Sequence, residues 1–232
     1  MMTDSTRPHR GFWGDLAVPE REAIEAVATR SSFPAGRTIL DRQDPCEDVV
    51  ILLSGFSKVM TRVSAGPHVV LAVRGPGDII GETTGIIGGE RTTSVAAIGL
   101  VEALRIYRAA FAAVLTEHPR AADALQRALI NKLRESDDDR LAAGYMTVGQ
   151  RLARFLLKLA QRHGAPVSSG GTSIGVALSQ RDLAACVGGS PRAVARELED
   201  WRQRRFIQTG RRSIVIMRPD DLRRIAGPAA PP

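Results

Sequence analysis

The fold is decided by the stretch LSQRDLAACVGGSPRAVAR, residues 178–196, because it carries two helix starts close together. Ser179 is followed three residues later by Asp182, which is close to a capping box. Ser190 is followed by Pro191, a favourable pair for the N-cap and the first position of a helix. Two glycines between the helices predict a tight turn. A helix, a short glycine turn and a second helix are typical of the helix-turn-helix motif.

The residues on either side of this stretch predict the rest of a small domain. Residues 207–217 have two apolar ends around Thr209-Gly210-Arg211-Arg212, which predicts a hairpin with a basic tip, or wing. Residues 151–163 predict a helix with one apolar face, and residues 173–178 predict a strand.

The positive charge of the chain is concentrated in the same region. The net charge of all 232 residues is only +7. Residues 1–149 hold 17 basic and 19 acidic side chains, whereas residues 150–232 hold 15 basic and 6 acidic ones. A net charge of +9 on the last third, against −2 on the rest, favours a C-terminal module that binds a polyanion. An arginine-rich solvated surface is the alternative from charge alone.

From Phe33 to residue 107 the sequence has a different texture. Short apolar runs alternate with Gly, Pro and Asp at a spacing of ~8–12 residues, which predicts a β-barrel or sandwich. A short helix is predicted before them, over residues 15–30, with Pro19 in its first turn. The apolar runs are residues 38–40, 49–53, 57–63, 68–73, 94–98 and 103–107.

Two helices are predicted after the strands. Residues 109–115 predict a short helix that ends before Pro119, and residues 120–145 predict a long one. A stripe at helical spacing runs along the long helix and suits packing against a partner helix. The acidic residues 135–139 are interpreted as a solvated face that neighbouring arginines neutralise. The members of the stripe are Leu125, Leu129, Leu133, Ser136, Arg140 and Ala143.

A second group of chemistry-bearing residues lies among the barrel strands, in GPGDIIGE at residues 75–82 and GGERTT at residues 88–93. Gly81-Glu82 predicts a short helical turn whose free N–H groups face an anion. Arg91 supplies a fixed positive charge that suits a phosphate.

Hydroxyl and carboxylate groups complete this group. Thr92 and Thr93 are hydroxyl donors, and Glu82 is an acceptor suited to a ribose hydroxyl. A carboxylate and a guanidinium together suit a sugar phosphate better than a bare anion. The alternative is that the glycines only form turns and that Glu82 and Arg91 form a surface ion pair.

These residues resemble the cyclic-nucleotide-binding domain of the cyclic-AMP receptor protein/FNR (Crp/Fnr) family of transcription regulators. The nine-residue step from Glu82 to Arg91 fits one form of the family's phosphate-binding cassette. Thr83 and Thr84 stand where the family usually has apolar residues. The matching residues are Leu53-Ser54-Gly55, Lys58-Val59, Gly75-Pro76-Gly77-Asp78, Gly81-Glu82 and Arg91-Thr92-Thr93.

The resemblance implies a role for each residue of this site. The backbone of Gly81 and the side chains of Arg91 and Thr92 are expected to contact a cyclic phosphate, with Thr93 beside them. Glu82 is expected to contact the ribose 2′-hydroxyl. The effector implied is a cyclic nucleotide, with cyclic AMP preferred to cyclic GMP.

The resemblance also makes the long helix the dimerisation helix, which in this family closes over the purine. We expect Lys132, Ser136 and Asp137 to lie nearest the base, and Ser136 is on the stripe described above.

The stretch at residues 178–196 resembles the winged helix-turn-helix of the same family. Ser190, Arg192 and Arg196 lie within two turns of the start of the second helix, where a recognition helix meets base edges in the major groove. The family often has Ser-Arg-Glu where this chain has Ser-Pro-Arg, so the usual operator is not assumed. The residues expected to hold phosphates are Gln180, Arg181, Arg211 and Arg212.

The expected fold class is α+β, with an N-terminal jelly-roll β-barrel, a long dimerisation helix and a C-terminal winged helix-turn-helix. The expected segments are a disordered N-terminus (1–10), a sensor barrel (11–118), the dimerisation helix and hinge (119–147), the DNA-binding domain (148–226) and a disordered tail (227–232).

The expected function is that of a homodimeric, ligand-responsive regulator of a roughly palindromic double-stranded DNA site, with RNA polymerase as a further partner. Two alternatives stay open. One is a DNA-binding regulator whose barrel binds another small molecule or none, and the other is a regulatory subunit or adaptor that binds protein or RNA.

Several classes of function are not expected. The four histidines are scattered and form no catalytic pattern, so no enzyme is expected. Two cysteines are too few for an iron–sulfur cluster, and no metal site is expected. The sequence has neither ~18 consecutive apolar residues nor a signal peptide, so the chain is expected in the cytoplasm and not at a membrane.

Overall fold

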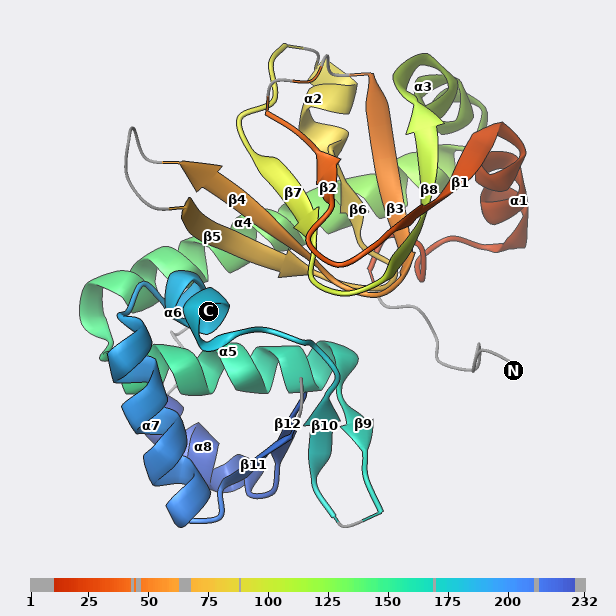
Figure 1. Ribbon diagram of the computed structural model, residues 1–232. Helices are drawn as coiled ribbons and strands as arrows, with labels where there is room; N and C mark the ends of the chain where they lie inside the picture. Colours follow the sequence, from red (N-terminus) through yellow and green to blue (C-terminus); the bar gives the residue numbers. More distant parts are fainter. Residues whose placement is uncertain are drawn as a thin grey trace. The chain divides into compact units, whose positions relative to one another are not determined.

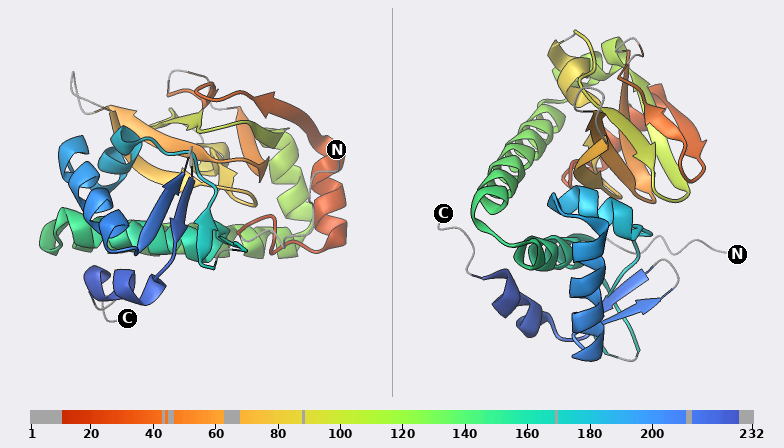
Figure 2. Two further views of the ribbon diagram at one scale, coloured as in Figure 1. Left: turned by 60° about the horizontal axis from the view of Figure 1, so that its bottom comes forward. Right: turned by 60° about the vertical axis from the view of Figure 1, so that its left-hand side comes forward.

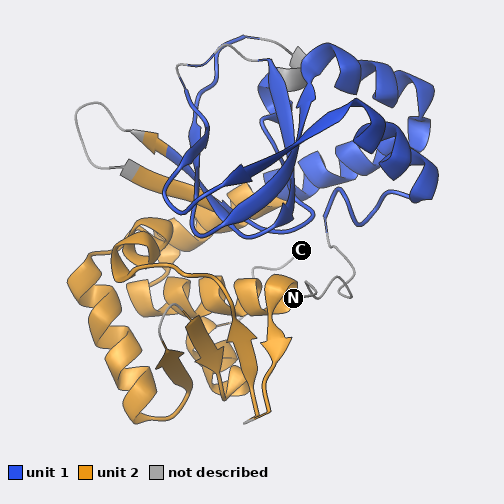
Figure 3. Ribbon diagram, turned by 45° about the vertical axis from the view of Figure 1, so that its right-hand side comes forward, with its two compact units in different colours: residues 1–60, 73–133 blue, residues 61–72, 134–232 orange. Residues whose placement is uncertain are grey.

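The computed structural model describes residues 11–42, 44, 47–62, 68–87, 89–168, 170–210 and 213–227. The chain divides into two compact units, one formed by residues up to 60 and 73–133 and the other by residues 61–72 and 134 onward (Figure 3). The expected disordered segments are residues 1–10 and 227–232, and all of these residues except Gly227 lie outside the described residues. No helix in these ranges is long and apolar enough to cross a membrane.

The first unit is organised around strand β3, Asp48–Ser54, whose residues 49–52 have no exposed surface. A continuous apolar run of this kind is buried on both faces of a sheet. Because successive side chains point to opposite faces, β3 enters two cores. Val49 and Ile51 pack with helical residues such as Phe111, whereas Val50 and Leu52 pack with strand residues such as Val95.

The strands of this region form two four-stranded sheets, in the orders β1-β8-β3-β6 and β2-β7-β4-β5 (Figure 1). Both sheets contribute to the core around Val50 and Leu52. This arrangement confirms the expected β-rich N-terminal domain. The strands besides β3 are β1 Ala28–Phe33, β2 Thr38–Leu40, β4 Ser57–Arg62, β5 His68–Arg74, β6 Ile79–Ile80, β7 Ser94–Ala97 and β8 Val101–Tyr107.

The first helix, α1, is shorter than expected. It spans Val18–Val27, with Pro19 in its first turn, and ends where the chain becomes strand β1. The expectation of a helix to residue 30 is therefore wrong. Residues 28–33 pair antiparallel with β8 along their whole length, and this tertiary pairing overrides the short apolar spacing that suggested a longer helix.

The expected pair of helices after the barrel is confirmed as α3, Arg108–Glu117, and α4, Pro119–Tyr145. The residues of the expected stripe on α4 do not all pack against one partner helix. Leu125 is buried in the core of the first unit and Leu129 packs against that core. Helical spacing marks a face that packs, but it does not say against what. The large apolar side chains that stay exposed on α4 are Ile130, Leu133, Leu141 and Tyr145.

The second unit contains the remaining helices and one further sheet, in the order β11-β12-β10-β9. The predicted strand over residues 173–178 is only partly correct, because β10 ends at Ile174. Helix α8 was not predicted and packs against α5. These elements are α5 Val148–His163, β9 Ala165–Pro166, β10 Thr172–Ile174, α6 Gln180–Val187, α7 Pro191–Gln203, β11 Ile207–Gly210, β12 Ser213–Ile216 and α8 Pro219–Ala226.

The acidic residues 135–139 of α4 are not merely a solvated face. Asp137 does pair with Arg140, at 3.6 Å and at i,i+3 spacing. Glu135, however, pairs with Arg162 of α5 at 2.6 Å, and Asp139 pairs with Lys158 at 3.6 Å. Both ion pairs join the C-terminal part of α4 to the next helix in the chain, α5 (Figure 2).

Candidate effector site and nucleic-acid interface

The candidate effector site begins at Gly81, where strand β6 ends and helix α2, Glu82–Ile87, begins. Gly81 has a φ of +78°, which favours glycine. A side chain there would also collide with its neighbours, since a Cβ would lie 2.7 Å from Nη1 of Arg91 and 2.8 Å from Cδ1 of Leu40. The glycine therefore lets the backbone approach the arginine closely.

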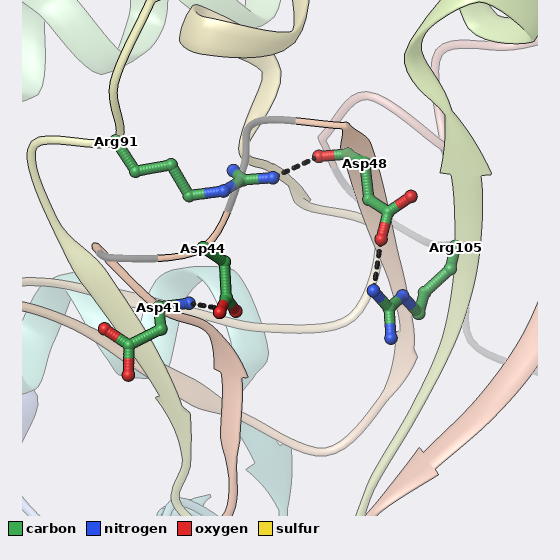
Figure 4. Close-up of polar contacts among 5 residues, drawn as sticks. All are labelled: Asp41, Asp44, Asp48, Arg91 and Arg105. Atoms are coloured by element: carbon green, nitrogen blue, oxygen red, sulfur yellow. Dashed lines mark hydrogen bonds and ion pairs between the residues drawn. The ribbon is translucent and has the colours of Figure 1, made fainter.

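Arg91 is buried next to this turn, with 5% of its surface exposed. Its Nη2 donates a hydrogen bond of 2.8 Å to the backbone carbonyl of Asp48, at the start of β3 (Figure 4). The Asp48 carboxylate in turn accepts a hydrogen bond from Arg105 on β8. The Nε of Arg91 has no hydrogen-bond partner within the described residues. A buried guanidinium N–H without an acceptor suits an anionic ligand.

Glu82 is also buried, with 5% exposed surface, and it pairs with Lys132 of α4. The Nζ of Lys132 lies 2.7 Å from Oε1 of Glu82 and donates a second hydrogen bond, of 2.6 Å, to the carbonyl of Ile79. Burial lowers the pKa of Lys132, and the Glu82 carboxylate opposes that shift. Glu82 and Arg91 are both buried and form no ion pair with each other among the described residues, so they are not the surface ion pair considered above.

Other buried charges act on Lys132 as well. Arg74 opposes its positive charge and so lowers its pKa further, whereas Asp78 and Glu82 favour the charged form.

The other four expected effector residues are not buried in the structure. Thr92 is exposed and Thr93 half-buried, directly after Arg91. Ser136 and Asp137 are exposed on α4, and Asp137 pairs with Arg140. Contacts between these four residues and an effector stay predictions.

Asp48 and Arg105 belong to the site but were not identified from the sequence. Asp48 reaches Arg91 through its backbone carbonyl, 43 positions away in the chain. A backbone contact of this kind leaves no residue-type signal in the sequence. The pairing of Lys132 with Glu82 was also missed, although both residues were named, because they lie 50 positions apart in the chain.

The helix-turn-helix forms as expected from its capping residues. Ser179 and Asp182 form a reciprocal capping box at the start of α6. Gly188 ends that helix in the left-handed conformation, with φ 59° and ψ 40°, which glycine adopts without strain. The Ser190 hydroxyl accepts a hydrogen bond from the backbone N–H of Ala193 and so caps α7.

The two helices of the motif pack through apolar side chains on their facing sides. Leu183 and Val187 of α6 and Val194 and Leu198 of α7 are all buried. The opposite face of α7 is therefore free to present polar side chains.

The described residues expected to meet DNA are all exposed. Gln180 and Arg181 lie on the first turn of α6, and Ser190 and Arg192 lie at the start of α7. Arg196 follows one turn later with a side chain that is 79% exposed and 3.6 Å from Glu197. Arg211 and Arg212 lie outside the described residues. The positions on α7 are those from which a recognition helix reads base edges.

Two domain families match the chain. Residues 30–118 match the model of the cyclic nucleotide-binding domain, and residues 150–225 match that of the Crp-like helix-turn-helix domain. The match to the second domain includes most of α8, a helix that was not among the elements expected from the sequence.

Relatives match over nearly the whole chain. The CRP-like cAMP-activated global transcriptional regulator of Mycobacterium tuberculosis is 30% identical over 210 residues, which cover 89% of this chain and 93% of that protein. The cyclic AMP receptor protein of Thermus thermophilus is 26% identical over 211 residues, which cover 91% and 94%. The solved structure of FixK2 from Bradyrhizobium japonicum has the same fold, with a TM-score of 0.76 at 24% identity over 88% of this chain and all of that one.

Proposed function

The chain belongs to the Crp-like family of transcription regulators, and we propose that a cyclic nucleotide bound in its barrel controls its binding to DNA. The observation that carries this proposal is the buried Nε of Arg91, which has no acceptor among the described residues and lies between Gly81 and the start of β3. An ionised donor without a partner is costly in a protein interior. A cyclic phosphate supplies the missing acceptor.

The single charge of a cyclic phosphate suits the single guanidinium of Arg91, which is buried. A cyclic nucleotide carries one negative charge, whereas a terminal phosphate carries about −1.5 to −2 at neutral pH. Two relatives are named for cyclic AMP, and we therefore propose cyclic AMP before cyclic GMP.

Lys132 connects the effector to the long helix. A ribose hydroxyl that donates to Glu82 shares this carboxylate with Lys132, and the phosphate adds a negative charge nearby. The bound ligand therefore changes the environment of a lysine on α4, the helix that leads to the second unit. A ligand shifts a conformational equilibrium only by its difference in affinity for the two states, and this lysine is a residue at which such a difference arises.

A second candidate effector is an anion without a ribose. The observation in its favour is that Oε1 of Glu82 is already paired with Lys132 at 2.7 Å. A carboxylate that is satisfied in this way does not require a hydroxyl donor. Arg91 would then still bind the anion.

At the DNA, we propose that Arg192 and Arg196 bond base edges from α7 and that Gln180, Arg181, Arg211 and Arg212 hold phosphates. Arginine pairs with guanine O6 and N7 through two hydrogen bonds. A homodimer would place two such helices one DNA turn apart on a roughly palindromic site. Ile130, Leu133, Leu141 and Tyr145 support this dimer, because they are exposed on α4 within about 120° of its circumference.

The remaining assignments follow from the same family. We propose that the chain has no catalytic activity, needs neither a metal nor an iron–sulfur cluster, works with RNA polymerase and acts in the cytoplasm. We also retain residues 11–118 as the sensor, 119–147 as the dimerisation helix and hinge, and 148–226 as the DNA-binding domain.

Calorimetric titration of the full chain tests the effector. We expect heat on adding cyclic AMP, a weaker response to cyclic GMP, and little response to AMP or inorganic phosphate. No heat with either cyclic nucleotide at millimolar concentration contradicts the leading proposal. Heat with phosphate or AMP alone favours the second candidate.

Selection of bound DNA from a random pool, with and without cyclic AMP, tests the rest. We expect a roughly palindromic sequence whose recovery depends on the nucleotide. Equal retention of duplex DNA of any sequence, or of RNA, contradicts sequence-specific regulation.

A further inference from the structure

Arg151, on the first turn of α5, donates hydrogen bonds to carbonyls from three different segments. Its Nε bonds the carbonyl of Val187, the last residue of α6, at 2.6 Å. Its Nη2 bonds the carbonyl of Gly188, in the turn before α7, at 3.2 Å. Its Nη1 bonds the carbonyl of Met146, directly after α4. Nothing in the sequence distinguishes this arginine from the others on α5.

The three carbonyls are ones that helices leave unsatisfied. The last four carbonyls of a helix have no partner within it, and they carry the negative end of the helix dipole. Here the ends of α4 and α6 both direct such carbonyls at one guanidinium. The planar fork of arginine reaches all three acceptors at once, which the single ammonium group of lysine does not.

The turn before the recognition helix also lies directly on the start of α5. A Cβ on Gly189 would be 2.9 Å from Cγ1 of Val148 and 3.3 Å from its Cγ2. Gly189 is not in the left-handed region, so its backbone accepts alanine and only the valine stands in the way. Because Gly189 has no side chain, the turn can contact Val148 of α5 closely.

Helix α7 itself contacts the same end of α5. A Cβ on Gly149 would lie 2.8 Å from Oε2 of Glu197. This contact places a carboxylate at the N-terminal turn of α5, where the helix dipole favours negative charge. The first turn of α5 therefore contacts the recognition helix at Glu197 and the glycine turn before that helix at Gly189. This part of α5 follows the end of α4 after only two residues.

From these contacts we propose that Arg151 is a positioning residue for DNA recognition. It ties the end of α4 to the Gly188-Gly189 turn, and so sets where α7 begins relative to the long helix. Only one residue, Ser190, separates that turn from the first residue of α7. The inference rests on the proposed reading of DNA by α7, but it does not depend on which effector the barrel binds.

The test compares the full chain with Arg151→Gln and Arg151→Lys variants. Arg154→Gln is the matched control, since Arg154 is on the same helix and makes no hydrogen bond to another of the described residues. The measurement is the ratio of the dissociation constants for unrelated duplex DNA and for the selected operator. A variant that is only less stable loses affinity for operator DNA and for unrelated DNA in parallel, and its ratio stays unchanged. A change in the ratio therefore indicates that α7 is positioned differently.

We expect Arg151→Gln to lower the ratio by roughly 10-fold to 100-fold, the loss that corresponds to hydrogen bonds from one charged group. Arg151→Lys should fall between it and the wild type, and the control should match the wild type. The inference is overturned if the Arg151 variants keep the wild-type ratio or if the control loses as much.

A second pair of variants keeps the inference testable if the arginine variants do not fold. We expect Gly189→Ala to lower the same ratio, because its methyl group displaces the turn from Val148. Adding Val148→Ala removes the obstacle and should restore the ratio. Gly175→Ala is the control, since nothing lies within 4 Å of a Cβ there. Failure of Val148→Ala to rescue Gly189→Ala overturns the proposed seating of the turn.

The outcomes distinguish this inference from the function on which it rests. If the wild type shows no operator preference with or without a nucleotide, the proposed function fails and the inference with it. If the wild type is selective and all variants keep that selectivity, only the role of Arg151 fails.

Discussion

The effector site and the recognition helix differ in how their charged residues are assembled. The effector site collects Asp48, Glu82, Arg91 and Lys132 from four distant segments and buries most of their surface. The recognition helix presents Arg192 and Arg196 from one continuous stretch and leaves them exposed. Buried ionised groups depend on a few matched partners. Exposed arginines are solvated in the free protein, and their contacts with a polyanion compete with water and salt. Substitutions in the two regions should therefore have different signatures.

The largest effect is expected for the double variant Arg192→Ala/Arg196→Ala. Each arginine that bonds guanine contributes about 1–3 kcal/mol of discrimination between bases, so operator preference should be almost lost. Gel-shift titrations with operator and unrelated duplexes measure it. Arg223→Ala on α8 is the control and should keep the preference. Undiminished preference in the double variant would show that α7 does not read the bases.

Arg91→Ala should have the next largest effect, and it should act on the nucleotide instead of the DNA. Loss of a charged hydrogen-bond donor costs about 1.5–3 kcal/mol, so affinity for cyclic AMP should fall roughly 10-fold to 100-fold. Calorimetry measures it. Arg105→Gln, which leaves Arg91 in place but frees Asp48, should weaken binding less. If Arg91→Ala binds cyclic AMP like the wild type, the phosphate assignment is wrong.

The pairing of α4 with α5 should contribute less. Arg162→Glu places a negative charge against Glu135, and we expect the free energy of unfolding to fall by about 0.5–1 kcal/mol at low salt. The reciprocal double variant Glu135→Arg/Arg162→Glu should recover most of this loss, and high salt should shrink the difference. Urea unfolding at two salt concentrations tests both. If the double variant does not recover the free energy of unfolding, the Glu135–Arg162 ion pair is not the cause of the loss in Arg162→Glu.

The smallest effect is a pH dependence from Lys132. Its pKa is lowered by burial, so between that value and the usual value near 10.5 the unfolded chain binds more protons than the folded one. The stability of the wild type relative to Lys132→Met should therefore rise as the pH increases through this window. Urea unfolding at a series of pH values measures the difference. A difference that is flat or falls with pH contradicts the burial of a charged lysine.

The two regions also differ in how well the sequence predicted them. The capping residues Ser179, Asp182 and Ser190 specify α6 and α7 locally, and the structure places each as expected. In the candidate effector site, Gly81 and Arg91, both named from the sequence, lie close together, and Glu82 next to Gly81 is buried. The partners that hold them, the Asp48 carbonyl and Lys132, were not foreseen.

The same distinction explains the errors in the fold. The first three residues of strand β1 were assigned to the preceding helix, because the strand pairs with β8 residues that are 68 to 78 positions away in the chain. The stripe on α4 was assigned to one partner, although Leu125 packs in the core of the barrel's own unit. Helical periodicity records that a face is apolar, and a packing partner is a property of the assembled chain.

The sequence by itself determined the order of the strand-rich region, the long helix and the C-terminal domain. It also determined the helix-turn-helix with its caps and glycine turn, the excess of positive charge in the last third, and the residue types that suit a sugar phosphate. These features rest on short-range hydrogen bonding and side-chain chemistry, which neighbouring residues set. Only the tertiary structure decided that the Nε of Arg91 lies beside Gly81 without a partner among the described residues, that Lys132 pairs with Glu82, and that Arg151 bonds three carbonyls at the start of α5. Those contacts join segments that are distant along the chain, and they form only when burial brings the segments together.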